Sequence, residues 1–287
     1  MRIALLNSGL GLLAAAAQLH TLRPDADLVL AMDPDGMPWG ARTPTDIAQR
    51  SLACARAAAD YQPDVLVFAC NTGSVHALGA LRQEFEPTIP VVGTVPAIKP
   101  AAAASEDIAI WATAATTGSA YQGQLIAEFA AAERVAEVAC PGLADAIHAG
   151  DDAAAKAAVS DAAARTPAGC GAIVLGCTEY ELAADLITSA LPGVALFGSA
   201  SAVAAQALRR VAAAANGASE ARGTSGPASG RGTGTLRVLL SGRLSSLPPA
   251  ALRYPAGRLL AAMPIAAAPP GAPPAGDPAA SLAAPGG

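Results

Sequence analysis

Short apolar runs alternate along the chain with longer stretches that are rich in alanine and leucine. Each run ends in a turn that contains Gly, Ser, Asn or Pro, and a helix-forming stretch follows. This alternation of strand, turn and helix is typical of an α/β fold with mostly parallel sheets. The runs that we interpret as strands are Arg2–Leu6, Asp27–Ala31, Val65–Ala69, Val91–Val92, Ile108–Ala112 and Ile173–Leu175.

Two of the predicted strands end alike, each in a cysteine that is followed at once by polar residues. Val65–Ala69 leads into Cys70, and Ile173–Leu175 leads through Gly176 into Cys177. We interpret this likeness as a weak internal duplication, which predicts two similar lobes, each a mostly parallel sheet flanked by helices. Because sites in such folds form at the carboxyl ends of strands, we expect the active site between the lobes.

The boundary between the two predicted lobes falls near the prolines of residues 96–100. We therefore expect residues 1–95 to form the first lobe together with residues from about 199 to 217. Residues 96–198 are expected to form the second lobe.

The composition changes after the predicted second lobe. We interpret residues 218–263 as a linker and one last strand: residues 218–235 are rich in Gly, Ser, Thr and Ala, whereas Leu236–Leu240 is a predicted strand. Residues 264–287 are mostly Pro, Ala and Gly, with almost no charge or aromatic side chains. Such a tail buries too little apolar surface to offset its ordering entropy, so disorder is expected.

The overall composition excludes several classes of function. Of the 287 residues, 53% are hydrophobic and 14% charged, and the net charge is -5. The chain has no dense Lys/Arg cluster, so we expect no binding to nucleic acid. The apolar start, Met1–His20, is interrupted by polar and glycine residues where a secretion signal is most apolar, and no other stretch predicts a membrane span.

The cysteines point to free thiols rather than to disulfides or zinc. The chain has five, an odd number, and none has the spacing of a zinc site, so we expect no metal. Unpaired cysteines are typical of a reducing compartment, which predicts a cytoplasmic protein. The sequence is compatible with a homodimer and does not decide the oligomeric state.

The positions of Cys70 and Cys177 suggest paired acid/base chemistry. A single cysteine after a buried strand usually serves only packing. A thiol at the start of a helix, however, has its pKa lowered by backbone N–H groups and by the helix dipole. Two opposed thiols suit racemisation, because one removes a proton from one face of a carbon and the other returns a proton to the opposite face.

Six short motifs, in order over roughly residues 1–215, resemble the glutamate racemases. Phe68–Ser74 (FACNTGS) looks like the first cysteine motif of that family, and Leu175–Tyr180 (LGCTEY) looks like the second. Asn7–Gly11 is similar to the family's opening loop, and Asp33 with Pro38-Trp39-Gly40 is similar to its Asp then Pro-Tyr-Gly segment. Ile89–Pro100 is similar to the segment after the first cysteine, and Ala112–Thr116 with Tyr121-Gln122 is similar to the threonine loop.

The resemblance implies a racemase that works without pyridoxal phosphate or any other cofactor. It implies a small acidic amino acid bound between two lobes, and D-glutamate supplied for the peptidoglycan of the cell wall. Cys70 and Cys177 would be the two acid/base thiols. The residues that would hold the substrate are Ser8, Asn71, Thr72, Thr116 and Thr178, and those that would line one wall are Pro38, Trp39 and Gly40, which follow Asp33.

Three positions depart from the family pattern beside these cysteines. Asn7 stands where the family has an Asp that assists the first cysteine, and an amide orients but accepts no proton. Glu179 stands where the family has His, and His148 stands where it has Glu. We hypothesise that the last two are an exchange, so that an imidazole and a carboxylate still lie beside Cys177. The alternative is that His148 is merely a surface helix residue.

The sequence leaves three functions open. The segment Pro38–Gly40 and the segment 96–100 favour glutamate as substrate. Glu179 allows aspartate or another acidic amino acid, because the second motif of the aspartate racemases is also Gly-Cys-Thr-Glu. Asn7 and Glu179 together also allow a degenerate paralogue that binds an acidic amino acid without turning it over.

Overall fold

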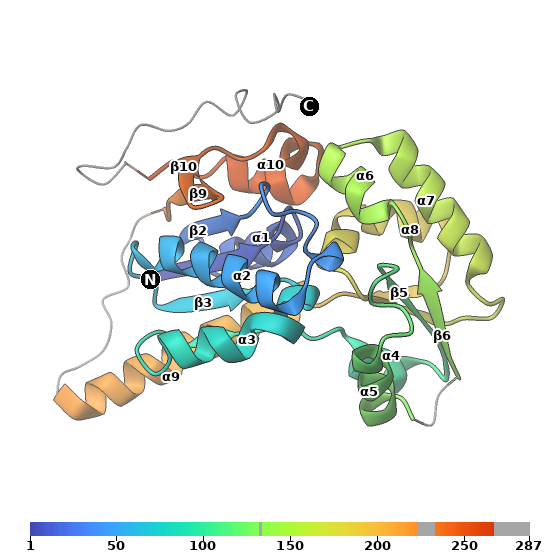
Figure 1. The fold of residues 1–287 in the computed structure, drawn as a ribbon, viewed down its shortest axis with the longest axis horizontal. Helices are drawn as coiled ribbons and strands as arrows, with labels where there is room; N and C mark the ends of the chain where they lie inside the picture. Colours follow the sequence, from blue (N-terminus) through green and yellow to red (C-terminus); the bar gives the residue numbers. More distant parts are fainter. Residues whose placement is uncertain (132–133, 223–232, 267–287) are drawn as a thin grey trace.

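The first of two sheets has six strands and is built from both ends of the chain (Figure 1). The structure is a computed structural model and describes residues 1–131, 134–222 and 233–266. The strand order is β10-β9-β2-β1-β3-β4, and only β10 is antiparallel to its neighbour. The strands are β1 (Arg2–Asn7), β2 (Asp27–Met32), β3 (Val65–Phe68), β4 (Val91–Val92), β9 (Leu236–Leu240) and β10 (Arg243–Ser245).

Helices cover both faces of this sheet because successive strand residues point to opposite sides. In β1, Ile3 and Leu5 pack with α1, α9 and α10, whereas Ala4 and Leu6 pack with α2 and α3. The short 3-10 helices η1 and η3 lie in the connections. The bounds are α1 (Leu12–Leu22), η1 (Trp39–Ala41), α2 (Pro44–Ala59), α3 (Asn71–Phe85), α9 (Ala200–Arg222), η3 (Pro249–Arg253) and α10 (Pro255–Ala261).

The second sheet has four parallel strands in the order β6-β5-β7-β8. Its faces are covered by α6, α7, η2 and α8 on one side and by α4 and α5 on the other. The strands are β5 (Asp107–Ala112), β6 (Arg134–Ala139), β7 (Ala172–Leu175) and β8 (Ala195–Phe197). The helices are α4 (Ile98–Ala104), α5 (Ala120–Phe129), α6 (Leu143–Ala149), α7 (Asp152–Arg165), η2 (Thr178–Ala183) and α8 (Ala184–Ala190).

The predicted fold class, two parallel-sheet α/β lobes flanked by helices, is confirmed. The four strands β2-β1-β3-β4 of the first sheet follow the same order as β6-β5-β7-β8 of the second. Cys70 follows β3 and Cys177 follows β7, so the two cysteines end corresponding strands. We refer below to the body around each sheet as the first and the second lobe.

The C-terminal part of the chain differs from its compositional prediction in two places. Helix α9 continues to Arg222, past the start of the predicted linker at residue 218. Pro264–Ala266, predicted to begin the disordered tail, instead pair with the backbone of Leu236 at 2.7 and 2.9 Å. The physical reason is that Leu236 lies in a buried strand, which gives these residues a template for hydrogen bonding. Residues 223–232 and 267–287 lie outside the described part of the chain.

Two features of the described residues, one of the helices and one of a strand, bear on the sequence predictions. Within residues 1–131, 134–222 and 233–266, no helix combines the length and the apolar character needed to cross a bilayer. The predicted strand Leu236–Leu240 is β9, and it pairs in parallel with β2. Residues 236–240 are therefore part of the first lobe's sheet.

We predict that removing the side chain of Leu236 destabilises the whole first lobe. Leu236 is fully buried, so Leu236→Ala should lower the free energy of unfolding in urea by about 2–5 kcal/mol. The matched control is Leu252→Ala in the same segment, where the side chain is 46% exposed and the change should cost at most ~0.5 kcal/mol. Equal losses in the two variants would contradict the packing described here.

Candidate active site

Each predicted catalytic cysteine lies at the tip of a strand that belongs to a different lobe. Cys70 is the N-cap residue of α3, and its Sγ accepts a hydrogen bond from the Gly73 N–H at 3.4 Å. Cys177 precedes η2 and is partly exposed. The two sulfurs are near enough that negative charge on Cys70 raises the pKa of Cys177. The fold therefore brings together two thiols that are far apart in the sequence.

The thiols do not have the lowered pKa that their positions predicted. Burial, followed by the charge of the Glu179 carboxylate, raises the pKa of Cys70 to about 12, although the backbone N–H groups of Gly73, Ser8 and Thr72 act in the opposite direction. Burial, followed by the neighbouring Glu179 carboxylate, raises the pKa of Cys177 well above its usual value. The prediction was wrong because desolvation of a buried thiolate outweighs the few N–H groups that face it. Both thiols are therefore protonated at neutral pH.

Glu179 and His148 lie together beside Cys177. The Cys177 thiol donates to Glu179 Oε2 at 2.9 Å, and His148 Nε2 lies 3.3 Å from Glu179 Oε1. The Leu10 N–H donates to Nδ1 of His148 at 3.3 Å, so the ring proton that faces Glu179 is on Nε2. The His148 side chain is only 10% exposed, which rules out the alternative of a surface helix residue.

The Glu179 carboxylate is ionised despite its burial. Desolvation alone would raise its pKa, but the hydrogen bonds that His148 and Cys177 donate to the carboxylate outweigh it. The resulting pKa is about 2. The Gly11 N–H adds a further hydrogen bond at 3.2 Å. Glu179 is thus a fixed negative charge that keeps the proton on Cys177.

Asn7 connects the two cysteine loops. Its buried amide nitrogen donates to the Ala69 carbonyl, next to Cys70, and to Thr178 Oγ1 at 3.1 Å, next to Cys177. The Thr178 hydroxyl in turn donates to Glu179 Oε2 at 3.3 Å. An ionised Asp at position 7 would set an oxygen against the Ala69 carbonyl, so this geometry favours the amide.

The other polar atom of Asn7 is also engaged, by its own loop. Oδ1 accepts from the Ser8 hydroxyl and from the Gly9 N–H, each at 3.2 Å. Both ends of the amide therefore have partners, and Asn7 has no free group for a proton transfer. Its role in the folded chain is to orient.

Asn71 makes a second connection between the lobes. Its amide nitrogen donates at 2.7 Å to the carbonyl of Gly176, the residue before Cys177. Its Oδ1 is buried and has no hydrogen-bond partner among the described residues. A buried acceptor without a partner is costly, and here it lies beside both cysteines. It is available to a ligand that carries N–H donors.

Two glycines of the opening loop allow the lobes to approach closely. A Cβ atom on Gly9 would lie 2.0 Å from Cε1 of His148, and one on Gly11 would lie 2.3 Å from Thr178 Oγ1. The loop can therefore present the N–H groups of Leu10 and Gly11 directly to the second lobe. The sequence analysis missed these two donors, although the Gly-x-Gly spacing signals close backbone contact.

Asp33 and Trp39 contact each other rather than the cysteines. The Trp39 Nε1–H donates to Asp33 Oδ2 at 2.9 Å, and Arg50 and Ser241 also bond to the Asp33 carboxylate. The Trp39 ring is buried and packs edge-on against Phe68, with ring centroids 5.9 Å apart. These contacts fix the Pro38–Gly40 segment against the strand that ends in Cys70.

The remaining predicted substrate-binding residues come from both lobes. Ser8 and Thr178 are buried in the network around Asn7, and Thr72 is in the first turn of α3. Thr116 lies in the loop after β5, where its hydroxyl is 3.1 Å from that of Thr113. The next residue back, Ala115, is the closest neighbour that a Cβ on Gly40 would meet, at 3.8 Å, so this loop faces the first lobe.

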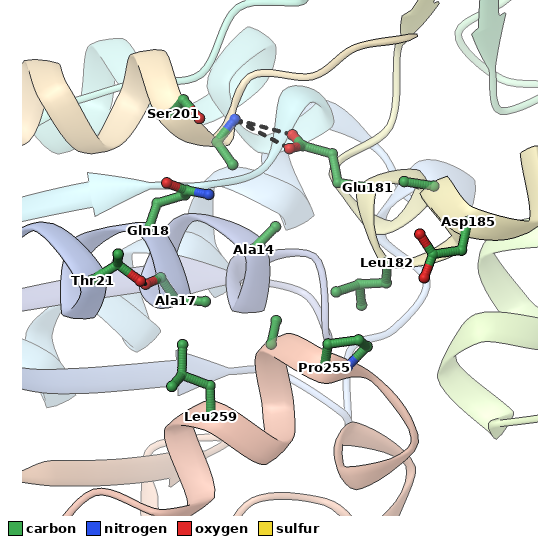
Figure 2. Close-up of a pocket in the computed structure, with 13 residues that line it drawn as sticks. Ala14, Ala17, Gln18, Thr21, Glu181, Leu182, Asp185, Ser201, Pro255 and Leu259 are labelled. Atoms are coloured by element: carbon green, nitrogen blue, oxygen red, sulfur yellow. Dashed lines mark hydrogen bonds between the residues drawn. The ribbon is translucent and has the colours of Figure 1, made fainter. Parts of the chain in front are cut away.

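A separate cavity of about 540 Å³ lies behind η2 and contains none of the predicted site residues (Figure 2). It is bounded by α1, η2, α8, α9 and α10. In its wall the partly buried Glu181 carboxylate accepts from the backbone N–H groups of Ser199 at 2.8 Å and Ala200 at 3.1 Å, at the start of α9. No group of three or more His, Cys, Asp or Glu in the described ranges is arranged to hold a metal ion.

Sequence comparisons identify the relatives of this chain. The sequence profile described as Asp/Glu/Hydantoin racemase matches residues 7–207. The glutamate racemase of Pseudomonas putida (strain W619) is 36% identical over 220 residues, which cover 74% of this chain and 82% of that protein. The glutamate racemase of Herpetosiphon aurantiacus is also 36% identical over 220 residues, covering 74% of this chain and 85% of that protein.

Solved structures show the same fold. Escherichia coli glutamate racemase, in complex with L-glutamate and the activator UDP-MurNAc-ala, matches with a TM-score of 0.71 at 25% identity, covering 88% of this chain and 91% of that one. The fold and the paired-cysteine site define an enzyme of the racemase class, an isomerase. The chain belongs to the Asp/Glu/hydantoin racemase family.

The close approach at Gly9 predicts a specific cost of adding one methyl group. Gly9→Ala should force the His148 ring to move and lower the free energy of unfolding by about 1–3 kcal/mol, measured in urea. Gly79→Ala is the matched control, because a Cβ there meets nothing within 4 Å. It lies within α3 and should stabilise the protein by up to ~1 kcal/mol. A neutral Gly9→Ala would show that the lobes are farther apart.

The lowered pKa of Glu179 predicts how stability depends on pH. The folded pKa of about 2 lies below the ordinary value of 4.5, so the contribution is complete above pH 4.5 and is lost as the pH falls toward 2. We expect wild type to lose about 2 kcal/mol more than Glu179→Gln between pH 6 and pH 3 in urea unfolding. The exposed Glu128→Gln should keep the wild-type dependence. Identical pH curves for wild type and Glu179→Gln would contradict the assignment.

Proposed function

We propose that this protein is a cofactor-independent glutamate racemase that uses Cys70 and Cys177 as its acid/base pair. The observation that carries the proposal is that two thiols from different lobes meet at one site and are linked by Asn7 and Asn71. The curated relatives and the E. coli structure, which contains L-glutamate, support glutamate as the substrate. The product would be D-glutamate for peptidoglycan.

The proposed reaction moves one proton on each face of the substrate's Cα. A thiolate on one side removes the Cα proton, so that the C–H bond breaks and an S–H bond forms. The thiol on the other side then donates its proton to the carbanion and becomes a thiolate. The two sulfurs end with their protonation states exchanged, and the reverse reaction restores them.

The substrate's ammonium group would supply the charge that makes a thiolate possible. Burial keeps both thiols protonated at neutral pH, and a bound cation lowers the pKa of a neighbouring thiol. We assign the ammonium to the unpartnered Oδ1 of Asn71. Of the two sulfurs, Cys70 has three N–H groups to stabilise a thiolate, whereas Cys177 faces the Glu179 anion. We therefore assign the thiolate of the substrate-bound resting state to Cys70 and the thiol to Cys177.

The same geometry supports the hypothesis that Glu and His have exchanged positions relative to the family pattern. We propose that Glu179 and His148 together serve Cys177, with the carboxylate touching the thiol and the imidazole touching the carboxylate. Asn7 has no free acceptor, so its proposed role is to hold the cysteine loops rather than to carry a proton.

We divide the remaining predicted residues between substrate binding and support. Ser8, Thr72 and Thr116 are proposed to hold the substrate's carboxylates. Thr178 and Asp33 are proposed to act indirectly, because protein partners already occupy their oxygens. Pro38, Trp39 and Gly40 are proposed to form one wall.

The five cysteines are free thiols, as expected in the cytoplasm, where we propose that the enzyme works. A homodimer is a further proposal.

The second candidate substrate is aspartate, which the Gly-Cys-Thr-Glu motif around Glu179 favours. A protein that binds an acidic amino acid without turnover is the third reading.

One assay separates these readings and tests the mechanism. Deuterium entry at Cα in D2O is measured separately for L-glutamate and for L-aspartate. We expect deuterium to enter L-glutamate. Cys70→Ser and Cys177→Ser should each reduce it at least ~100-fold, because a hydroxyl is a far weaker acid than a thiol. Cys54→Ser, at a buried thiol within α2, should keep the wild-type rate within a few fold. Exchange with aspartate alone, or with neither acid, would reject the glutamate assignment.

A further inference from the structure

The C-terminal segment, residues 233–266, contacts both lobes. It lies outside residues 7–207, the part that the family profile matches. Through β9 it is hydrogen bonded to the first lobe's sheet. Through η3 it reaches α6 of the second lobe, and Figure 1 shows α10 beside α6 where the two lobes meet. The segment is therefore placed to set the position of α6.

Tyr254 makes the contact between this segment and α6. Its hydroxyl donates to the carbonyl of Ile147 at 2.8 Å, and Ile147 directly precedes His148. Its ring packs against the apolar cores of both lobes. The adjacent Arg253 pairs with Asp152, and its stem occupies the space beside Gly150, the residue that ends α6. The end of α6 is thus held from outside on the side of His148.

The contacts of the His148 ring are sensitive to small displacements. Its two polar contacts, to the Leu10 N–H and to Glu179 Oε1, are both 3.3 Å long. Hydrogen bonds weaken steeply beyond about 3.5 Å, so a shift of a few tenths of an ångström would break them. The helix that carries His148 is short, spanning Leu143–Ala149, and His148 is its second-last residue, so a movement of the helix end moves the ring with it.

We propose that Tyr254 is a positioning residue for the reaction: its hydrogen bond to Ile147 holds the end of α6 so that Nε2 of His148 faces Glu179. Glu179 then remains ionised against the thiol of Cys177. This inference rests on the proposed racemase function, in which Cys177 exchanges protons with the substrate.

The variant Tyr254→Phe isolates the hydrogen bond, because it removes the hydroxyl and keeps the ring that packs against both cores. The matched control is Tyr61→Phe, the same change at a ring that lies against the Arg237 guanidinium, with 4.3 Å to the ring centroid. Tyr61 belongs to the first lobe, at the end opposite the cysteine loops, near the start of β1. A general cost of losing a tyrosine hydroxyl would appear in both variants.

The first measurement does not need activity. Long-range ¹H–¹⁵N correlation spectra distinguish the two nitrogens of each imidazole, and His148→Gln assigns His148 among the three histidines. We expect wild type and Tyr61→Phe to show one His148 species with the proton on Nε2. Tyr254→Phe should show a mixture of tautomers or a broadened signal. An unchanged His148 signal in Tyr254→Phe would overturn the proposal.

The second measurement is a double-mutant cycle on the rate of Cα exchange. Tyr254→Phe should lower kcat about three- to tenfold with KM changed less than about twofold, the size expected for one lost hydrogen bond. In the His148→Gln background the same change should have less than about a 1.5-fold effect, because Tyr254 acts through His148. Equal factors in both backgrounds would show a merely structural role. If wild type exchanges no acidic amino acid, the proposed function fails, and the spectra still decide the inference about Tyr254.

Discussion

The arrangement of the site depends on buried amide hydrogen bonds that cross between the lobes. Asn7 donates to an acceptor in each cysteine loop, and Asn71 donates to the backbone just before Cys177. A buried donor left without a partner costs about 1–3 kcal/mol, so separating the lobes would be penalised at each of these groups. The bonds therefore fix how far apart the two cysteine loops lie.

The same close approach explains why the site can hold an unusual set of charges. Backbone N–H groups of the Gly9–Gly11 loop reach the second lobe only because two glycines leave room for His148 and Thr178. The Leu10 N–H donates to His148 and the Gly11 N–H donates to Glu179, which is ionised although it is buried. Glu179 contacts the Cys177 thiol directly, whereas the Gly73 N–H donates to Cys70, so the two cysteines have different surroundings. A substrate that carries an ammonium group complements the resulting negative charge.

Much of the fold could be predicted from the sequence, because buried parallel strands are continuous apolar runs. The strands that were not predicted, β6, β8 and β10, are edge strands with partly exposed residues, and β6 contains Glu137 within its run. Composition also failed locally. The small polar residues after 217 were interpreted as a linker, yet α9 continues through the first of them, because alanine and its neighbours extend a helix that is already formed.

The candidate site could be predicted less completely. Cys70, Cys177, Glu179 and His148 could be identified by motif and position. In the structure, the side chains of Cys177, Glu179 and His148 form one chain of contacts. The direction of the thiol pKa values could not be inferred, since desolvation depends on what covers the strand tips. The partners of Asp33, which include Ser241 from the far end of the sequence, and the N–H donors of Leu10 and Gly11 also require the tertiary structure.

The central claim is that two sulfurs act on opposite faces of one carbon, and the early time course of isotope labelling tests it most directly. The protein would be incubated with L-glutamate in D2O, and the deuterium content of each enantiomer would be measured before a tenth of the substrate has reacted. A pair of thiols predicts that the D-glutamate formed carries deuterium at Cα while the remaining L-glutamate keeps its proton. Equal early labelling of both enantiomers, as a single base would give, would contradict the account.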